Sequence, residues 1–261
     1  MLSKAFVYAA GLGTRLRPYT FETPKPMLEV DGRPILEYIL RFLAHAGITD
    51  VTINTWHLAE QFESLPAVAA DFGVDVSLSR QPQRFEHGGD LAYARDFLAS
   101  LGADERFLGL NGDTFFDLDP AQLHTAAARV SADAPVLIFT RQTEANPLRT
   151  ESGRLVGIGN VTYAEANGAA VANADDFGIK VFHASIRNYL PAEPTTLSFH
   201  GYTGLVGRLA TAGKRVLVQP IENAERVEIG TVEDYEARDR NAALRALTAR
   251  LAVMPRSPAE P

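Results

Sequence analysis

The sequence predicts an α/β fold in which a mixed, mostly parallel sheet is flanked by helices. Three observations support this prediction. Strand and helix signals alternate along the first half of the chain, which is typical of strand–helix–strand units. The 261 residues are 46% hydrophobic and 22% charged, which is enough apolar sequence for one large domain. A glycine-rich turn follows the first apolar run, where ligands bind in sheets of this kind.

The elements of the first half follow from apolar periodicity. Residues 33–46 have Pro34 in the first turn, one apolar face and Gly47 as a stop signal, so they predict a helix. Further helices are predicted at 58–70, 91–101 and 120–130. Apolar, β-branched runs predict strands at 5–10, 51–54, 74–79, 106–110 and 135–140.

The second half has weaker signals. Turn sequences at Ser152-Gly153 and Asn167-Gly168 predict a short antiparallel excursion. Later strands are expected at 177–183 and 215–220, and later helices at 201–213 and 231–252. The sequence contains no hexapeptide repeat of the kind that builds a β-helix.

Composition excludes several classes of function. The net charge of −7 argues against general nucleic-acid binding, which requires a basic surplus. The first thirty residues nevertheless carry four basic and two acidic side chains, which suits a small anionic ligand. The absence of cysteine excludes disulfides, thiolate metal sites and a cysteine nucleophile. No apolar run approaches the ~18 residues of a membrane span, and the first run is a core strand rather than a signal peptide, so we expect a cytoplasmic protein.

The string Gly-Leu-Gly-Thr-Arg-Leu-Arg-Pro-Tyr-Thr-Phe-Glu-Thr-Pro-Lys-Pro-Met at 11–27 has the features of a polyphosphate site. A glycine turn leaving a strand lets backbone N–H groups approach phosphates without Cβ interference. Arg15 adds a planar fork of donors. Lys25 stands between Pro24 and Pro26, which restrict the backbone that presents it.

Two common phosphate loops do not fit this string. A P-loop requires Gly-Lys followed by Ser or Thr, and no such sequence follows the glycines. A dinucleotide fingerprint requires a third small residue where this chain has Leu16, which disfavours an NAD-dependent dehydrogenase.

The whole string 11–27 resembles the signature of the sugar-1-phosphate nucleotidylyltransferases, which make nucleotide sugars. The resemblance implies a Rossmann-like nucleotidyltransferase fold without a β-helix extension. It implies a single domain over 1–253, with a nucleotide-binding part at about 1–130, a sugar-binding part at about 131–235 and the helix 231–252 at its end. Residues 254–261 are rich in proline and are expected to form a frayed tail.

The resemblance also implies catalytic roles. Arg15 would stabilise the β- and γ-phosphates as they leave, and Lys25 would bridge the α-phosphate and the incoming sugar phosphate. The nucleotide would be contacted in this loop by Ala10, Gly11, Gly13 and Thr14.

Two carboxylates are candidates for a Mg²⁺ site. Asp113 closes the string Asn111-Gly112-Asp113 at a strand end, and the resemblance assigns it to the metal and Asn111 to the nucleoside or sugar. The family's second ligand is the aspartate of an Asp-x-Gly-Thr string, where residues 228–231 read Glu-Ile-Gly-Thr. Glu228 is therefore either the second ligand, one methylene longer than usual, or only a polar residue at a strand end.

Base and sugar recognition are predicted from weaker signals. Gln81 offers a donor and an acceptor to the edge of a base. Gly88 and Gly89 lie in a string similar to Glu-Thr-Gly-Gly-Gly of uridylyltransferases that act on N-acetylmuramic acid 1-phosphate, with mismatches at its second and last positions. The Glu-Lys pair that many relatives use for the sugar is absent, and Asn160 and Lys180 are the candidates in its place.

The predicted function is Mg²⁺-dependent nucleotidyl transfer from a nucleoside triphosphate to a sugar 1-phosphate. We favour UTP and N-acetylmuramate or a related amino-sugar 1-phosphate, in cell-wall recycling. The alternatives are a GTP-dependent mannose or heptose 1-phosphate guanylyltransferase, and a nucleotide-sugar sensor with weak catalysis. The expected partners are these small molecules, with no nucleic acid or membrane, and the protein is expected to be a monomer or dimer.

Overall fold

The computed structural model describes residues 2–142, 148–159, 161–163, 172–201, 203–221 and 224–253. They form two compact units, each assembled from separate stretches of the chain. We call Leu2–Arg84, Leu110–Gln122 and Ala224–Pro261 the α/β unit, and Phe85–Gly109 with Leu123–Asn223 the β-rich unit. The division into a nucleotide part at 1–130 and a sugar part at 131–235 stays a prediction. The expected tail at 254–261 lies outside the described residues.

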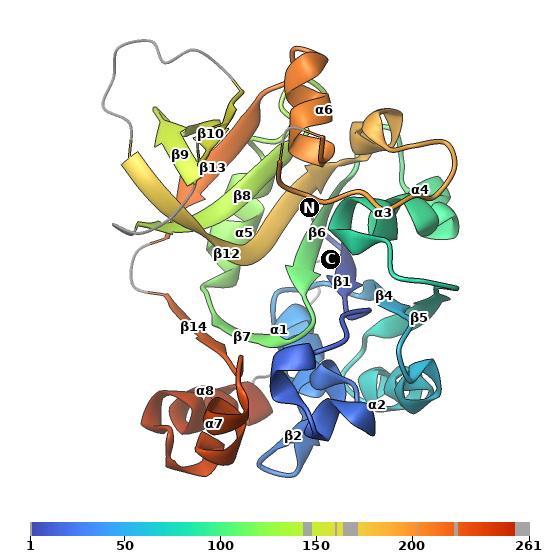
Figure 1. The fold of residues 1–261 in the computed structure, drawn as a ribbon, viewed down its shortest axis with the longest axis vertical. Helices are drawn as coiled ribbons and strands as arrows, with labels where there is room; N and C mark the ends of the chain where they lie inside the picture. The colour runs from blue at the N-terminus through green and yellow to red at the C-terminus, as the bar shows by residue number, and fades with distance from the viewer. Residues whose placement is uncertain are drawn as a thin grey trace. The chain divides into compact units, whose positions relative to one another are not determined.

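Three strands of the α/β unit pair in parallel. β1 (Lys4–Tyr8), β4 (Asp50–Thr55) and β5 (Asp75–Arg80) pair in that order (Figure 1). β1 and β4 are almost entirely buried, as expected for parallel strands covered on both faces, whereas in β5, at the edge of the sheet, Val76 alone is buried. These three strands confirm the predictions at 5–10, 51–54 and 74–79.

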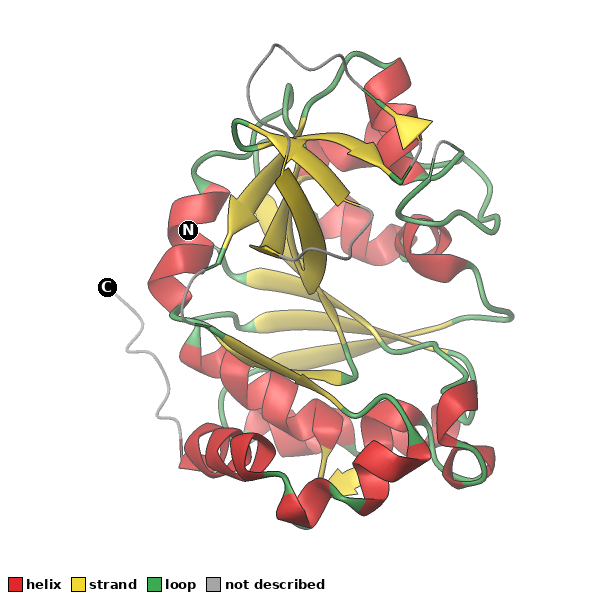
Figure 2. Cartoon of the chain, turned by 60° about the vertical axis from the view of Figure 1, so that its left-hand side comes forward, coloured by secondary structure: helices red, strands yellow, loops and turns green. Residues whose placement is uncertain are grey.

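Amphipathic helices pack on these strands and on one another (Figure 2). α1 (Ile35–His45) packs against α2 (Leu65–Ala70) and α8 (Ala242–Val253), and α2 packs against β5. The face of α1 predicted to be apolar is buried, and the helix ends before Gly47, whose φ of 76° glycine adopts without strain.

Short elements connect the core of the α/β unit. The segment after β1 contains three 3₁₀-helices, η1 (Thr14–Leu16), η2 (Tyr19–Phe21) and η3 (Lys25–Met27). β2 (Glu29–Val30) and β3 (Arg33–Pro34) form a small hairpin, and η4 (Ala59–Phe62) follows β4. β7 (Thr114–Asp117) pairs antiparallel with β14 (Glu225–Glu228), a pairing that the sequence did not predict.

The end of the chain departs from the single helix predicted at 231–252. α7 (Val232–Glu236) and η6 (Arg238–Arg240) precede α8. The side chain of Asn241 accepts a hydrogen bond from the Leu244 N–H at 3.0 Å, and so begins a new helix.

The β-rich unit contains a mixed sheet. β8 (Val136–Gln142) pairs parallel with β13 (Val216–Pro220) and antiparallel with β12 (Ala172–His183). β10 (Arg154–Ile158) pairs antiparallel with β13, and also with β9 (Leu148–Glu151) and β11 (Val161–Thr162). η5 (Ala184–Tyr189) and α6 (Leu205–Thr211) complete this part of the unit.

One predicted helix is interrupted, and two elements contain points at which the chain passes between the units. The helix predicted at 91–101 is two helices, α3 (Glu86–Tyr93) and α4 (Arg95–Ser100), because Ala94 has a non-helical ψ of 57°. β6 (Arg106–Asn111) and α5 (Pro120–Ala127) each cross from one unit to the other along the chain. Among the described residues, no helix is long and apolar enough to cross a membrane.

Candidate active site

The glycine turn after β1 has two glycines with different structural requirements. Gly13 has a φ of 58°, and a Cβ there would lie 2.9 Å from Thr20 Cγ2 and 3.0 Å from Lys25 Cβ. The Thr20 hydroxyl donates to the Gly13 carbonyl at 2.9 Å, which fixes the fold of the loop. A Cβ at Gly11, by contrast, would meet nothing within 4 Å. Gly11 therefore leaves open space beside an exposed backbone, as close approach of a phosphate requires.

Side chains at the end of β4 and just after it hold this loop in place, and sequence reasoning missed them. Asn54 Oδ1 accepts from the Ala9 N–H at 2.6 Å in the core. His57 Nε2 lies 2.9 Å from the Thr20 carbonyl oxygen, and Gln61 donates to the Glu22 carbonyl at 2.6 Å. The available signal was their position at or just beyond the carboxyl end of β4, the strand adjacent to the one that carries the loop.

Lys25 is buried and joins two carboxylates. Its Nζ lies 2.7 Å from Asp113 Oδ2 and 3.4 Å from Glu228 Oε1, and 6% of the residue is exposed. The Met27 N–H donates to the Pro24 carbonyl at 2.8 Å and closes the turn of η3 that presents the lysine. The structure thus brings together three side chains that the sequence analysis assigned to catalysis and metal binding.

Asp113 owes its position to the glycine before it. The Gly112 N–H donates to the Tyr8 carbonyl at 2.8 Å, and a Cβ on Gly112 would lie 2.9 Å from that same oxygen. Only glycine lets the chain lie this close to the end of β1, so Asp113 emerges beside the loop. Thr114 Oγ1 donates to Asp113 Oδ1 at 3.2 Å.

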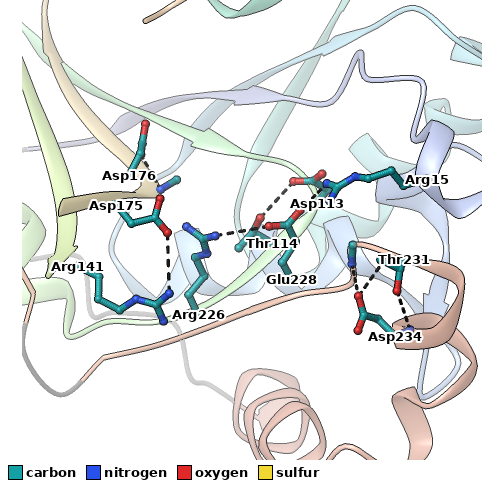
Figure 3. A network of polar contacts seen from close by, with 12 residues as sticks. Arg15, Asp113, Thr114, Arg141, Asp175, Asp176, Arg226, Glu228, Thr231 and Asp234 are labelled. Atoms are coloured by element: carbon teal, nitrogen blue, oxygen red, sulfur yellow. Dashed lines mark hydrogen bonds and ion pairs between the residues drawn. The ribbon is translucent and has the colours of Figure 1, made fainter. Parts of the chain in front are cut away.

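Glu228 is surrounded by basic side chains. Arg15 Nη2 lies 3.3 Å from Glu228 Oε1, and Arg226 Nη2 lies 3.5 Å from Glu228 Oε2. Figure 3 shows these two arginines reaching the carboxylate from different sides. β14 ends at Glu228, and the chain then enters α7 through a capping box in which the side chains of Thr231 and Asp234 each accept a hydrogen bond from the backbone N–H of the other (Figure 3).

The donor set of this cluster fits a hard divalent cation. Mg²⁺ is usually held by one or two carboxylates together with phosphate oxygens and water. Asp113 and Glu228 offer two carboxylates whose oxygens share Lys25 as a partner. Within the described residues, no group of three His, Asp or Glu side chains is arranged as a complete metal cage. Two carboxylates without a third protein ligand in the described part of the chain suit a metal ion whose other ligands are phosphate oxygens and water.

The remaining nucleotide candidates belong to the same α/β unit as this cluster. Gln81 directly follows β5, its N–H donates to the Thr55 carbonyl at 2.8 Å, and it is 7% exposed. Both polar atoms of its side chain, and Asn111 Oδ1, are buried without a hydrogen-bond partner among the described residues. Such a buried group costs about 1–3 kcal/mol, so a ligand that satisfied it would gain that energy. Ala10 is buried and Thr14 exposed.

Three further candidates have sequence positions within the β-rich unit, and their roles stay predictions. Gly88 and Gly89 are in α3, where both N–H groups donate to the Leu197 carbonyl and a Cβ on Gly89 would lie 2.2 Å from the Thr195 carbonyl oxygen. This close packing is itself a reason for glycine at both positions. Asn160 lies outside the described residues.

Lys180 belongs to a buried ion pair in the β-rich unit. Its Nζ lies 2.8 Å from Asp176 Oδ2 and 4.9 Å from the centre of the Phe199 ring. His200 Nε2 lies 2.9 Å from the same Asp176 oxygen. Burial alone would raise the pKa of Asp176, but Lys180 and His200 hold that pKa well below its usual range. The predicted sugar contact of Lys180 is untested.

The chain is similar to known nucleotidyltransferases. The model of the nucleotidyl transferase family matches residues 4–148. N-acetylmuramate α-1-phosphate uridylyltransferase of Neisseria meningitidis is 38% identical over 133 residues, which are 51% of this chain and 54% of that protein. UTP–glucose-1-phosphate uridylyltransferase of a Synechocystis species is 30% identical over 205 residues, 72% of this chain and 51% of that protein. The mannose-1-phosphate guanylyltransferase catalytic subunit beta of Drosophila melanogaster is 30% identical over 200 residues, which are 75% of this chain and 52% of that protein.

The chain thus spans about half the length of these curated relatives. Among solved structures, the inositol-1-phosphate CTP transferase from T. maritima superimposes with a TM-score of 0.72 over 98% of both chains, at 18% identity. That similarity confirms the Rossmann-like nucleotidyltransferase fold predicted from the sequence.

Proposed function

The chain belongs to the nucleotidyl transferase family, and we propose that it is a Mg²⁺-dependent sugar-1-phosphate nucleotidylyltransferase. The reaction joins a nucleoside triphosphate and a sugar 1-phosphate into a nucleotide sugar and pyrophosphate. One observation carries the proposal: Lys25 and Arg15, both from the loop after β1, meet the carboxylates of Asp113 and Glu228. Two cations and two potential metal ligands are therefore gathered beside a glycine turn with open space at Gly11.

The reaction needs charge neutralisation and alignment more than covalent chemistry. An oxygen of the sugar phosphate attacks the α-phosphorus, a new P–O bond forms, and the bond to the β-phosphate breaks as pyrophosphate leaves. Both reactants are anions, so their approach is opposed by repulsion. A Mg²⁺ held by Asp113 and Glu228 would supply Lewis-acid stabilisation of phosphate oxygens.

The two basic side chains have different tasks. Lys25 is a buried point charge, which suits the crowded position between the α-phosphate and the sugar phosphate. The Arg15 side chain is 70% exposed, and its planar fork suits the two outer phosphates that leave. Charge that develops on the leaving group is stabilised by donors already in place, an effect worth about 3–4 kcal/mol for one such contact.

For the substrates we favour UTP and N-acetylmuramate 1-phosphate or a related amino-sugar 1-phosphate. The identity of 38% with a uridylyltransferase named for that sugar supports this choice. A GTP-dependent mannose-type activity is the alternative, supported by the guanylyltransferase relative. The unpartnered amide of Gln81 suits either base, since uracil and guanine both present an adjacent donor and acceptor.

The test is pyrophosphate release in the presence of Mg²⁺, with five nucleoside triphosphates crossed against a panel of sugar 1-phosphates. We expect release with UTP and an amino-sugar 1-phosphate. Release with GTP and mannose 1-phosphate would retain the reaction and replace the substrates. Tight binding of a nucleotide sugar without any release would instead identify a sensor.

A further inference from the structure

The ammonium group of Lys25 occupies the position between the two carboxylates proposed to hold the metal. Its Nζ is 2.7 Å from Asp113 Oδ2 and 3.4 Å from Glu228 Oε1. The Lys25 side chain is 7% exposed, so its ammonium has little access to water and depends on these two partners. A cation of the protein itself therefore bridges the oxygens at which a divalent cation would bind.

The other carboxylate oxygens have partners as well. Thr114 donates to Asp113 Oδ1, and Arg226 lies 3.5 Å from Glu228 Oε2. Arg15 lies 3.3 Å from the Glu228 oxygen that also contacts the lysine. Three basic side chains thus surround two carboxylates, and the cluster has a positive sum of formal charges. A divalent cation that arrives alone is repelled by this charge and must displace the ammonium.

A metal ion bound to a polyphosphate meets a different balance. Phosphate oxygens provide new partners for Lys25 and Arg15, so these groups can leave the carboxylates without becoming unpaired. A metal–triphosphate complex also carries net negative charge toward a positive cluster. Because an unpaired buried charge is strongly unfavourable, the exchange of partners decides which ligand can enter.

We propose that Lys25 makes the carboxylate pair selective for a metal–polyphosphate complex over the free metal ion. In the free protein Lys25 holds Asp113 and Glu228, and it releases them when phosphate oxygens become its partners. The inference rests on the proposed function for the class of ligand, but it concerns binding and requires no turnover. Metal and polyphosphate then bind cooperatively, and coupling between two sites typically amounts to about 5- to 150-fold in affinity.

The experiment is a titration of Mn²⁺ without nucleotide, with bound and free ion distinguished by electron paramagnetic resonance. Lys25→Met keeps much of the length of the side chain and removes its charge. Lys4→Met is the matched control, because it changes the net charge equally but removes an ammonium that lies 3.8 Å from Asp50. We expect Lys25→Met to bind Mn²⁺ about 10- to 100-fold more tightly than the unmodified protein, and Lys4→Met to be unchanged.

A second substitution locates the ion. Asp113→Asn in the Lys25→Met background should remove the added Mn²⁺ affinity. The inference is overturned if folded Lys25→Met binds Mn²⁺ no more tightly than the unmodified protein, or if the added affinity survives Asp113→Asn. Should Lys25→Met fail to fold, Lys25→Gln, which retains a polar group, carries the same prediction.

The outcomes separate this inference from the proposed function. Pyrophosphate release by the unmodified protein, with no gain of Mn²⁺ affinity in Lys25→Met, contradicts only the role of Lys25 as a competitor of the metal. A gain of Mn²⁺ affinity in a protein that releases no pyrophosphate contradicts only the proposed reaction.

Discussion

Glu228 of β14 lies directly opposite Thr114 of β7 in their antiparallel register. Asp113 immediately precedes Thr114, so the strand pairing brings two carboxylates from distant parts of the sequence to one place. The Gly112 N–H bond to Tyr8 then fixes this ribbon beside the loop that carries Arg15 and Lys25. Backbone hydrogen bonds therefore position the charged cluster, and its side chains can exchange partners without a change of fold.

Shortening Glu228 tests whether it is a ligand. Because the backbone register positions this residue, Glu228→Asp should keep Mg²⁺-dependent turnover within about tenfold, whereas Glu228→Ala should lose about 10²–10³ in kcat. Steady-state kinetics with Mg²⁺ measure both. Glu225→Ala, at the exposed start of the same strand, is the control and should have unchanged kinetics. An equal loss in Glu228→Asp and Glu228→Ala would show that the longer side chain is required.

Removing the charge of Asp113 tests the other carboxylate. Asp113→Asn has nearly the same shape but is a much weaker ligand for Mg²⁺, so we expect turnover to fall by at least ~10² and to require more Mg²⁺. The dependence of the rate on Mg²⁺ concentration measures this. Asp117→Asn, at the far end of β7, serves as the control. A Mg²⁺ dependence equal to that of the unmodified protein would contradict a ligand role for Asp113.

The two glycines of the loop should respond differently to alanine. Gly13→Ala strains a residue with a φ of 58° and brings Cβ against Thr20 and Lys25, so it should lower stability by about 1–3 kcal/mol. Gly11→Ala should change stability by less than ~0.5 kcal/mol but weaken binding of the triphosphate. Chemical denaturation and nucleotide titration separate the effects. Unchanged nucleotide affinity in Gly11→Ala would contradict close approach of a phosphate there.

The Asp176–Lys180 pair predicts a dependence of stability on pH. The pKa of Asp176 is lower in the folded protein than its ordinary value, so the folded state favours the ionised carboxylate. The contribution is therefore complete above the ordinary pKa of 3.8 and is lost as the pH falls through the lower folded pKa. At neutral pH, Asp176→Asn leaves buried Lys180 unpaired and should cost about 3–5 kcal/mol.

Denaturation of the unmodified protein and Asp176→Asn across a pH series measures this effect. The difference in unfolding free energy should be constant near neutral pH and shrink in acid. Asp175→Asn is the control, because its partner Arg141 is exposed and 3.9 Å away, and it should cost at most about 1 kcal/mol. A difference between the proteins that persists unchanged below the ordinary pKa would contradict the pairing.

The sequence predicted those parts of the fold that local patterns determine. The run 5–10 and the face of helix 33–46 are apolar with clear periodicity, and β1 and α1 form there. The β7–β14 pair was not predicted, because pairing between strands more than a hundred residues apart has no local signal in Thr114–Asp117 or Glu225–Glu228. Helix breaks were also missed, since a single non-helical ψ at Ala94 leaves the apolar pattern intact.

The same distinction applies to the candidate site. The sequence alone was enough to identify Arg15, Lys25 and Asp113 as candidates, because each lies in a characteristic motif that follows a predicted strand. Arg226 was not found, because its relation to Glu228 depends on their shared face of β14 and on an ion pair. Asn54 and His57 support the loop through single hydrogen bonds to backbone atoms, which no sequence pattern specifies.

The central claim is that Lys25 acts on the transferred nucleotidyl group. The most direct measurement is the rate of pyrophosphate release by the unmodified protein and Lys25→Ala, with saturating UTP, N-acetylmuramate 1-phosphate and Mg²⁺. We predict release by the unmodified protein and a kcat lower by at least ~10² in folded Lys25→Ala. Equal rates in the two proteins would contradict the account, because a buried lysine in contact with both carboxylates would then have no part in the reaction.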